Sequence, residues 1–272
     1  MFQDIAPHIY KNEYKPRPAN PDDYVIFCRE REVCLRETEN GAVFPTVREM
    51  PAGDLQYLFA VDDRAFYLRK GPLPKLDGWD FLPTQRFRSL IPAWAGFAAI
   101  TAHRLWLWYG QNRFCGRCGQ PMHHSETERA MQCACGHIVY PTISPSVIVG
   151  VTNGDKLLLT RYANSHSTYR HYALVAGYAE IGETLEQTVR REVLEETGLQ
   201  VKDIRYYKSQ PWPFSGALLA GFYCTLEGSE TITLDENELS DAVWLHRSEM
   251  EPREDTASLT SEMIEQFRLG NQ

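Results

Sequence analysis

The sequence predicts an α+β protein built from an N-terminal α+β domain, a zinc ribbon and a C-terminal mixed sheet between helices. Hairpin-type strand patterns open the chain, and two cysteine pairs follow a helical segment. Two apolar strand patterns then precede a carboxylate-rich helix. We expect the three domains at residues 1–110, 111–142 and 143–272.

Composition limits the classes of protein. The chain has 272 residues, enough for roughly two domains of about 150 residues each. No apolar run approaches the ~20 residues that cross a bilayer, and the first residues lack the pattern of a signal peptide. We therefore expect a cytoplasmic protein without membrane contact. The net charge of −8 disfavours a broad nucleic-acid-binding surface, although a local groove could still be basic.

The N-terminal domain is predicted from strand alternation and turn residues. Strands are expected at residues 24–29, 32–36, 55–61 and 65–68. Asn40-Gly41 is a hairpin turn signal, and residues 93–109 have a helical pattern. Cys28 and Cys34 lie within the strands without a partner at metal spacing, so we expect them to be small packing residues.

The next segment contains two closely spaced cysteine pairs, each followed by glycine. In a chain with an odd number of cysteines, seven, this pattern favours a tetrahedral zinc site over disulfides. The expected ligands are Cys115, Cys118, Cys133 and Cys135. Only one residue separates the second pair, so replacement of a ligand by His123 or His137, or a knuckle without metal, are the alternatives. Four thiolates leave no open position, which predicts a structural role.

The C-terminal domain begins with a predicted hairpin. Residues 145–152 and 156–162 are apolar strands joined by Asn153-Gly154-Asp155. Further strands are expected at residues 204–207, 218–226 and 242–245, and a closing helix at 261–267.

A helix is predicted from about Leu185 to Thr197. Thr184 and Gln187 form a capping box at its start, and Gly198 is a typical C-terminal residue. An apolar stripe along the helix, Leu185, Val189 and Val193, predicts which face is buried.

Glu192, Glu195 and Glu196 share one arc of this helix beside the apolar stripe. The alternative to a site is a solvated acidic face. However, Glu192 and Glu196 repel each other at i, i+4, which costs a few tenths of a kcal/mol, and the helix C-terminus already carries partial negative charge. A Mg²⁺ or Mn²⁺ ion would offset both effects, so we expect one here.

The stretch from Gly177 to Leu199 resembles the signature of the Nudix hydrolases. Its fixed positions are occupied by Gly177, Glu183, Arg191, Glu192, Val193, Glu195, Glu196, Gly198 and Leu199. The resemblance implies an α/β/α sandwich that hydrolyses a nucleoside diphosphate linked to another group. It implies catalytic roles for Glu183, Arg191, Glu192, Glu195 and Glu196. It also implies Mg²⁺ or Mn²⁺ ligands at Glu192, Glu195, Glu196, Glu238 and the carbonyl of Ala176.

The two prolines of the sequence SQPWPF, residues 209–214, predict a stiffened loop. This sequence resembles the specificity motif of the NADH pyrophosphatase subfamily, which also carries a zinc ribbon. Ser215 and Ala217 replace the proline and the last serine of that motif, and Thr260 replaces a small residue. The resemblance implies stacking of Tyr178 on a base. The other implied substrate-binding residues are Arg88, Glu128, Tyr140, Gln210, Pro211, Trp212, Pro213, Phe214, Ser215, Gly216, Ala217 and Thr260.

The resemblance therefore implies hydrolysis of NADH to NMNH and AMP, slower hydrolysis of NAD⁺, removal of NAD caps from RNA 5′ ends, and a homodimer. Two alternatives are enzymes, acting on ADP-ribose or on diadenosine polyphosphates. Two belong to other classes: a dinucleotide-sensing module that does not cleave, and a zinc-ribbon nucleic-acid adaptor. All the acids of the signature are present, which disfavours the sensor, and the acidic composition disfavours the adaptor.

Overall fold

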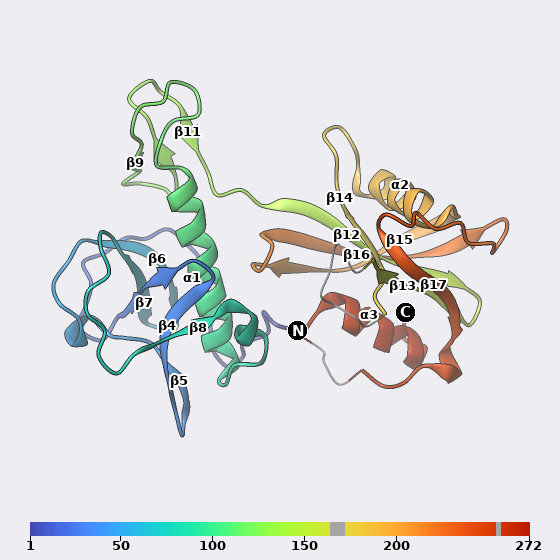
Figure 1. Cartoon of the computed structure of the whole chain (residues 1–272), viewed down its shortest axis with the longest axis horizontal. Helices are drawn as coiled ribbons and strands as arrows, with labels where there is room; N and C mark the ends of the chain where they lie inside the picture. The colour runs from blue at the N-terminus through green and yellow to red at the C-terminus, as the bar shows by residue number, and fades with distance from the viewer. Residues whose placement is uncertain (164–171, 254–256) are drawn as a thin grey trace. The chain divides into compact units, whose positions relative to one another are not determined.

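The computed structural model describes residues 1–163, 172–253 and 257–272, and it divides into two compact units (Figure 1). One unit is Phe2–Thr142, and the other is Ile143–Gln272 with Met1. The predicted division of the first unit at residue 110 stays a prediction. Among the described residues, no helix has the length and apolarity to span a membrane.

The unit Phe2–Thr142 contains small sheets and one long helix. One sheet has the order β1-β6-β7-β2, another is β3-β4-β5 with β8 on β4, and the ribbon sheet is β11-β10-β9. The elements are β1 (Tyr10–Lys11), β2 (Tyr24–Ile26), β3 (Cys28–Arg29), β4 (Glu32–Thr38), β5 (Gly41–Val43), η1 (Val47–Glu49), β6 (Leu55–Val61), β7 (Arg64–Arg69), β8 (Asp80–Pro83), η2 (Thr84–Ser89), α1 (Ala93–Gln111), β9 (His123–His124), β10 (Met131–Gln132) and β11 (Ile138–Val139). The predicted hairpin at Asn40-Gly41 is confirmed by pairing of Thr38 with Gly41. Cys28 and Cys34 are buried packing residues, as expected.

The other unit is built on one sheet of order β15-β16-β12-β13-β17, with β14 paired to β12. Strands β12 and β16 are parallel and the other pairs are antiparallel, so the predicted mixed sheet is confirmed. The elements are β12 (Ser144–Asn153), β13 (Lys156–Tyr162), β14 (Val175–Tyr178), α2 (Leu185–Thr197), β15 (Gln200–Trp212), β16 (Ala217–Glu227), β17 (Leu239–His246), η3 (Arg247–Glu249) and α3 (Leu259–Leu269).

Alternation along β12 places a helix on each face of this sheet. Val147, Val149 and Val151 belong to the core cluster that contains Val189 and Val193 of α2. Ile148 instead belongs to the cluster that contains Met263 and Phe267 of α3. Successive side chains of a strand point to opposite faces, so one apolar strand serves two cores and the α/β/α sandwich is confirmed.

Helix α2 begins and ends where its capping residues predict. Thr184 Oγ1 accepts a hydrogen bond from the Gln187 amide (3.2 Å), and Gln187 Oε1 accepts one from the Thr184 amide (2.8 Å). Gly198 has φ +71° and ψ 5°, the left-handed conformation of a helix C-cap. These local signals define the last turn, in which Glu195 and Glu196 lie.

The predicted loop at residues 209–214 is wrong for residues 209–212. Strand β15 continues to Trp212, where it pairs with Ala217 of β16, and only residues 213–216 form the turn. Pro211 is tolerated because β15 is the edge strand of the sheet, where a missing N–H removes no hydrogen bond from a second neighbour. The prolines therefore stiffen a hairpin.

We predict that Gly198→Ala destabilises the C-terminal unit by about 1–2 kcal/mol, because a side chain is strained in the left-handed conformation. The added Cβ would also lie 3.0 Å from Thr233 Cβ. Gly110→Ala is the control: that glycine is inside helix α1 with no atom within 4 Å of an added Cβ, so alanine should stabilise its own unit by about 0.5–1 kcal/mol. Urea unfolding measures the change in the free energy of unfolding in each variant. Equal changes in the two variants would contradict the assignment of Gly198 as the helix cap.

Candidate active site

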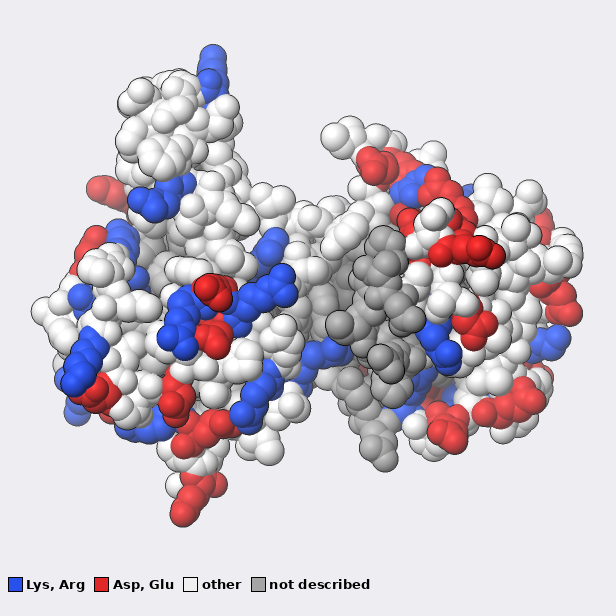
Figure 2. All heavy atoms as spheres, viewed as in Figure 1, with Lys and Arg blue, Asp and Glu red and all other residues white. Residues whose placement is uncertain are grey.

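The acidic residues of α2 differ in burial. Glu192 and Glu196 are 8% and 2% exposed, whereas the Glu195 side chain is 58% exposed. Burial of the Val189 and Val193 stripe against the sheet carries the first two acids inward with it. Acidic side chains gather over this helix in Figure 2, next to a basic one. Glu195 thus lies at the outer edge of the group.

Gly177 makes room for Glu192. A Cβ on Gly177 would lie 1.9 Å from Cδ of Glu192 and 2.0 Å from its Oε1, so only glycine allows this approach. The carbonyl of Gly177 accepts a hydrogen bond from Ser146 Oγ (2.8 Å) in β12. Ser146 was not predicted, although a buried hydroxyl in an otherwise apolar strand was the signal that could have identified it.

Arg191 connects the acids of the site. Its Nε and Nη2 donate to Glu183 Oε1 and Oε2 at 2.7 and 2.9 Å, which makes a bidentate ion pair. Its Nη1 donates to Glu192 Oε1 (2.8 Å) and Glu195 Oε2 (3.0 Å). The Arg191 guanidinium is the main cause that lowers the pKa of Glu183 to about 2. Glu183 also accepts from Thr188 Oγ1 (3.0 Å), a second contact missed from sequence, so we assign Glu183 the role of orienting Arg191.

The environment of Glu196 suits a divalent cation. Its Oε2 is buried and has no hydrogen-bond partner within the described ranges. Burial, followed by repulsion from Glu192 and Glu238, raises the pKa of Glu196 to about 8, while a hydrogen bond from the backbone of Ala176 opposes the rise. Burial also raises the pKa of Glu192. A Mg²⁺ or Mn²⁺ ion would supply the missing partner and remove the repulsion, so the donors present fit such an ion.

The carboxylates of Glu192 and Glu238 lie close enough to Glu196 to raise its pKa, and the backbone of Ala176 donates a hydrogen bond that lowers it. In the described part of the chain, however, only the four ribbon cysteines form a compact group of three or more ligand side chains. Arg191 holds the carboxylates of Glu192 and Glu195 by ion pairs. The contribution of Glu195 to metal binding stays a prediction.

The predicted base-binding residues lie on β14 and on the β15–β16 hairpin. Tyr178 is 52% exposed at the end of β14. The rings of Trp212 and Phe214 have centroids 4.9 Å apart at 49°, which presents adjoining flat surfaces. The residues from Pro211 to Ala217 all belong to this hairpin, with Gly216 at φ +80° in its turn.

Gln210 has a different environment from the one expected. It is fully buried, and its Nε2 donates to the Ala257 carbonyl (2.8 Å) while its Oε1 accepts from the Leu259 amide (2.7 Å). The buried amide of Gln210 is therefore not presented for direct contact with a substrate. Gln210 instead fastens the motif to the start of α3, where the predicted substrate residue Thr260 lies.

Three predicted substrate residues lie in the unit Phe2–Thr142. Arg88 is in η2, and Tyr140 Oη donates to Glu128 Oε1 (3.1 Å) after the ribbon sheet. The structure brings Glu128 and Tyr140 together. Their assignment to the substrate site, and that of Arg88, stays a prediction.

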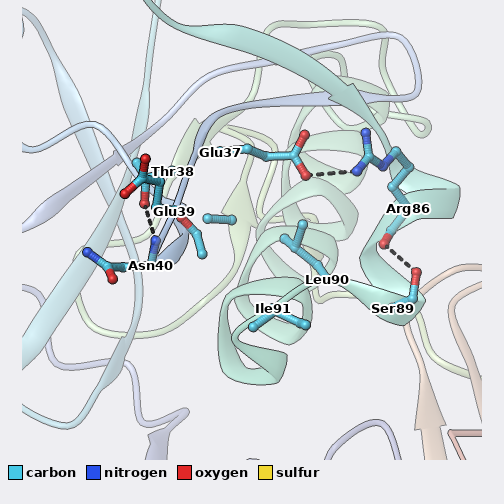
Figure 3. A pocket seen from close by; sticks show the side chains of 10 residues that line it. Glu37, Thr38, Glu39, Asn40, Arg86, Ser89, Leu90 and Ile91 are labelled. Carbon is cyan, nitrogen blue, oxygen red and sulfur yellow. Dashed lines mark hydrogen bonds and ion pairs between the residues drawn. The ribbon is translucent and has the colours of Figure 1, made fainter.

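A pocket of about 460 Å³ lies in the same unit, between the β4–β5 hairpin and residues 86–91 (Figure 3). None of its lining residues was predicted to bind substrate. Its Arg86 and Glu37 side chains bind each other at 2.8 Å, so their charges are already paired. We therefore place the chemistry on α2.

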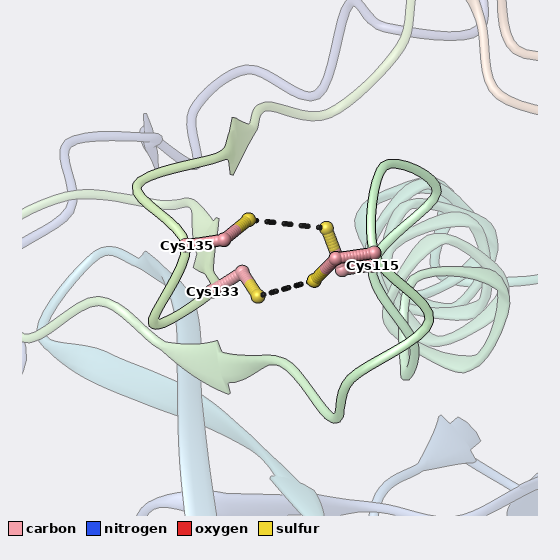
Figure 4. A group of neighbouring side chains, drawn as sticks. Cys115, Cys133 and Cys135 are labelled. Carbon is pink, nitrogen blue, oxygen red and sulfur yellow. Dashed lines mark hydrogen bonds between the residues drawn. The ribbon is translucent and has the colours of Figure 1, made fainter.

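The ribbon cysteines converge, as predicted. The Sγ atoms of Cys115, Cys118, Cys133 and Cys135 all lie within 4.8 Å of one another (Figure 4). Cys115 and Cys135 Sγ are 3.8 Å apart, and Cys118 and Cys133 Sγ are 3.5 Å apart. Four sulfurs at about 2.3 Å from a tetrahedral zinc are about 3.8 Å from one another, so the short second pair closes the site without a histidine.

We predict that metal-free protein loses stability as pH rises from 6 to 8. The raised pKa of Glu196, about 8, means that the folded state holds a proton that the unfolded state has already lost near pH 4.5. The expected loss is about 2 kcal/mol, and Glu196→Gln should remove it. Urea unfolding in a chelator at pH 6 and 8 measures the difference between wild type and variant. A wild-type free energy of unfolding that does not fall relative to the variant would contradict the burial of Glu196.

We predict one zinc ion per chain that survives dialysis. Cys118→Ser should lose the zinc and destabilise the ribbon, because one of four ligands is gone, while hydrolysis at α2 is spared. Elemental analysis and thermal unfolding of wild type and variant provide the test. A wild-type protein without zinc would indicate a degenerate knuckle.

Family models match two regions of the chain. Residues 142–267 match the NUDIX domain, and residues 111–140 match the NADH pyrophosphatase zinc ribbon domain. A crystal structure of a NUDIX hydrolase from Nitrosomonas europaea is similar over 58% of this chain and 90% of that chain, at 24% identity and a TM-score of 0.49.

Similar curated proteins are named NAD-capped RNA hydrolase NudC. The protein of Salmonella paratyphi C is 40% identical over 166 residues, which cover 60% of this chain and 63% of the relative. That of Actinobacillus succinogenes is 47% identical over 141 residues, 50% of this chain and 53% of the relative. The matches thus span less than two thirds of these relatives. The chain therefore carries a Nudix domain over residues 142–267 and the zinc ribbon domain of NADH pyrophosphatases over residues 111–140.

Proposed function

We propose that the protein hydrolyses the pyrophosphate of NADH and NAD⁺ to NMNH or NMN plus AMP, and that it removes NAD from the 5′ ends of RNA. The observation that carries the proposal is the pair of buried acids on α2, Glu192 and Glu196, in a Nudix signature whose Arg191 binds Glu192. The zinc ribbon of NADH pyrophosphatases and the relatives named NAD-capped RNA hydrolase support this substrate class.

The residues of the site would have the following roles. A bound Mg²⁺ or Mn²⁺ would polarise the pyrophosphate and lower the pKa of a water molecule. Glu192, Glu196 and Glu238 would hold it, and Arg191 would keep Glu192 in position through their 2.8 Å contact. Tyr178, Trp212 and Phe214 would bind a base. Binding at a base remote from the reacting phosphate would fix the phosphates in place for attack.

We further propose a cytoplasmic homodimer. The support is the same family resemblance, and light scattering of the purified chain tests the oligomeric state.

We predict that kcat/KM for NADH exceeds that for ATP or ADP-ribose by at least tenfold, since the dinucleotide engages the carboxylate helix at its pyrophosphate and the aromatic residues at a base at the same time. Trp212→Ala or Tyr178→Ala should narrow this preference while a poor substrate is still cleaved. Product chromatography for the three substrates in wild type and both variants provides the test, with Tyr206→Ala, 59% exposed on the same sheet, as control. Equal wild-type values for NADH and ADP-ribose would leave only a general Nudix hydrolase.

A second measurement distinguishes a hydrolase from a dinucleotide sensor that does not cleave. Glu196→Gln should lower kcat at least 10²-fold with saturating metal. Near-normal turnover in this variant would reject the role of Glu196, and absence of turnover in wild type with either ion would favour the dinucleotide sensor.

A further inference from the structure

The ribbon has a face without carboxylates, although the whole chain has a net charge of −8. Residues 111–125 and 130–142 contain no Asp or Glu. The acids between them, Glu126 and Glu128, lie in the turn that joins β9 and β10. The second cysteine pair lies in the turn at the other end of β10, so the acids are separated from the zinc end of the ribbon.

Strand register shows which side chains face solvent. Gln132 of β10 pairs with His123 of β9 and with Ile138 of β11, so the three form one row across the sheet. His123 is exposed and Ile138 is 43% exposed. The neighbouring row faces inward, since its Met131 is 3% exposed. The outward row therefore offers an imidazole, an amide and an apolar side chain.

The same ribbon exposes an aromatic ring and two cations. Phe114 is 61% exposed, and the Arg113 guanidinium lies 6.0 Å from the centroid of its ring. Phe114 pairs with Pro121, and the Met122 amide donates to the Arg113 carbonyl (2.9 Å), which places both residues next to the start of β9. Arg117 is exposed in the first cysteine knuckle. We name the six residues Arg113, Phe114, Arg117, His123, Gln132 and Ile138 the knuckle face.

We propose that the knuckle face binds the single-stranded RNA of a capped substrate; that this RNA carries an NAD cap rests on the proposed function. Unpaired bases stack on exposed aromatic rings, and guanidinium groups bind phosphate oxygens. Figure 2 shows blue and white atoms, but no red ones, at the tip of the ribbon on the visible side. An acid-free surface with an exposed ring fits a polyanion that carries bases better than it fits an acidic or purely apolar partner.

The charges also set the expected salt dependence. Four thiolates around a zinc ion have a formal charge of −2, which Arg113 and Arg117 balance. The attraction for phosphate is therefore local to the two guanidinium groups, and stacking on Phe114 supplies the rest of the affinity. The salt dependence should correspond to about two phosphate contacts, each contributing a slope of about −0.7 in a plot of log K against log salt concentration.

Direct binding tests this proposal without catalysis. The probe is a fluorescein-labelled, uncapped, single-stranded RNA of about 20 nucleotides, titrated with the zinc-loaded full chain in fluorescence anisotropy. Phe114→Ala should raise Kd at least fivefold. Arg113→Gln should raise Kd and reduce the salt slope by about 0.7. The matched controls are Ile9→Ala, also 61% exposed, and Arg31→Gln, an exposed arginine of the same unit; both should leave Kd unchanged.

A catalytic comparison locates the effect on the substrate. Phe114→Ala should lower kcat/KM for NAD-capped RNA at least fivefold and leave that for free NADH unchanged. Zinc content by elemental analysis must equal that of wild type in each variant. If wild type cleaves neither substrate, the proposed function fails, while the binding titration still decides the proposal for the knuckle face.

Three outcomes would overturn the proposal. The first is an RNA affinity that both substitutions leave unchanged. The second is an equal loss of kcat/KM for NADH and for capped RNA, which would indicate a general effect on the enzyme. The third is dissociation of a dimer by Phe114→Ala with RNA affinity intact, which would make the face an interface between copies of the chain.

Discussion

The close approach of Glu192 to the backbone of Gly177 is the constraint on which the site depends. A side chain at residue 177 would overlap the carboxylate, and Ser146 donates a hydrogen bond to the Gly177 carbonyl. Helix α2 can therefore pack its valines onto the sheet while its acids still reach strand β14. The valine stripe that packs the helix thus also determines where its acids lie.

That packing brings charge into a region where charge is unfavourable. Burial and mutual repulsion raise the pKa of Glu196 to about 8, and Arg191 offsets only part of the negative charge because its three carboxylate contacts are with Glu183, Glu192 and Glu195. The buried Oε2 of Glu196 is thus the acceptor that most needs a cation. A divalent ion there would stabilise the fold and enable the chemistry through the same contact, which links stability to metal content.

The motif at residues 209–214 has two functions in this fold. Its buried residue, Gln210, binds backbone groups of Ala257 and Leu259 and so fixes the beginning of α3. Its aromatic residues, Trp212 and Phe214, lie at the hairpin end and form the surface that we assign to a base. The zinc ribbon is similarly divided, since one side of its sheet packs inward through Met131 and the other presents the knuckle face to solvent.

Local signals in the sequence determined helix α2, the paired strands β12 and β13, and the zinc ligands. Capping residues, a two-residue turn and cysteine spacing each act over a few residues, so they can be read without a tertiary structure. The bidentate contact of Arg191 was also predictable, because Glu183 is fixed by the same signature. Only the tertiary structure decided that β15 extends through Pro211, since tolerance of proline depends on the position of the strand at the sheet edge. Packing between segments far apart in the chain, which no local pattern encodes, likewise decided three other features. It buried Gln210, left Glu195 exposed while Glu196 is buried, and brought the hydroxyl of Ser146 to the Gly177 carbonyl.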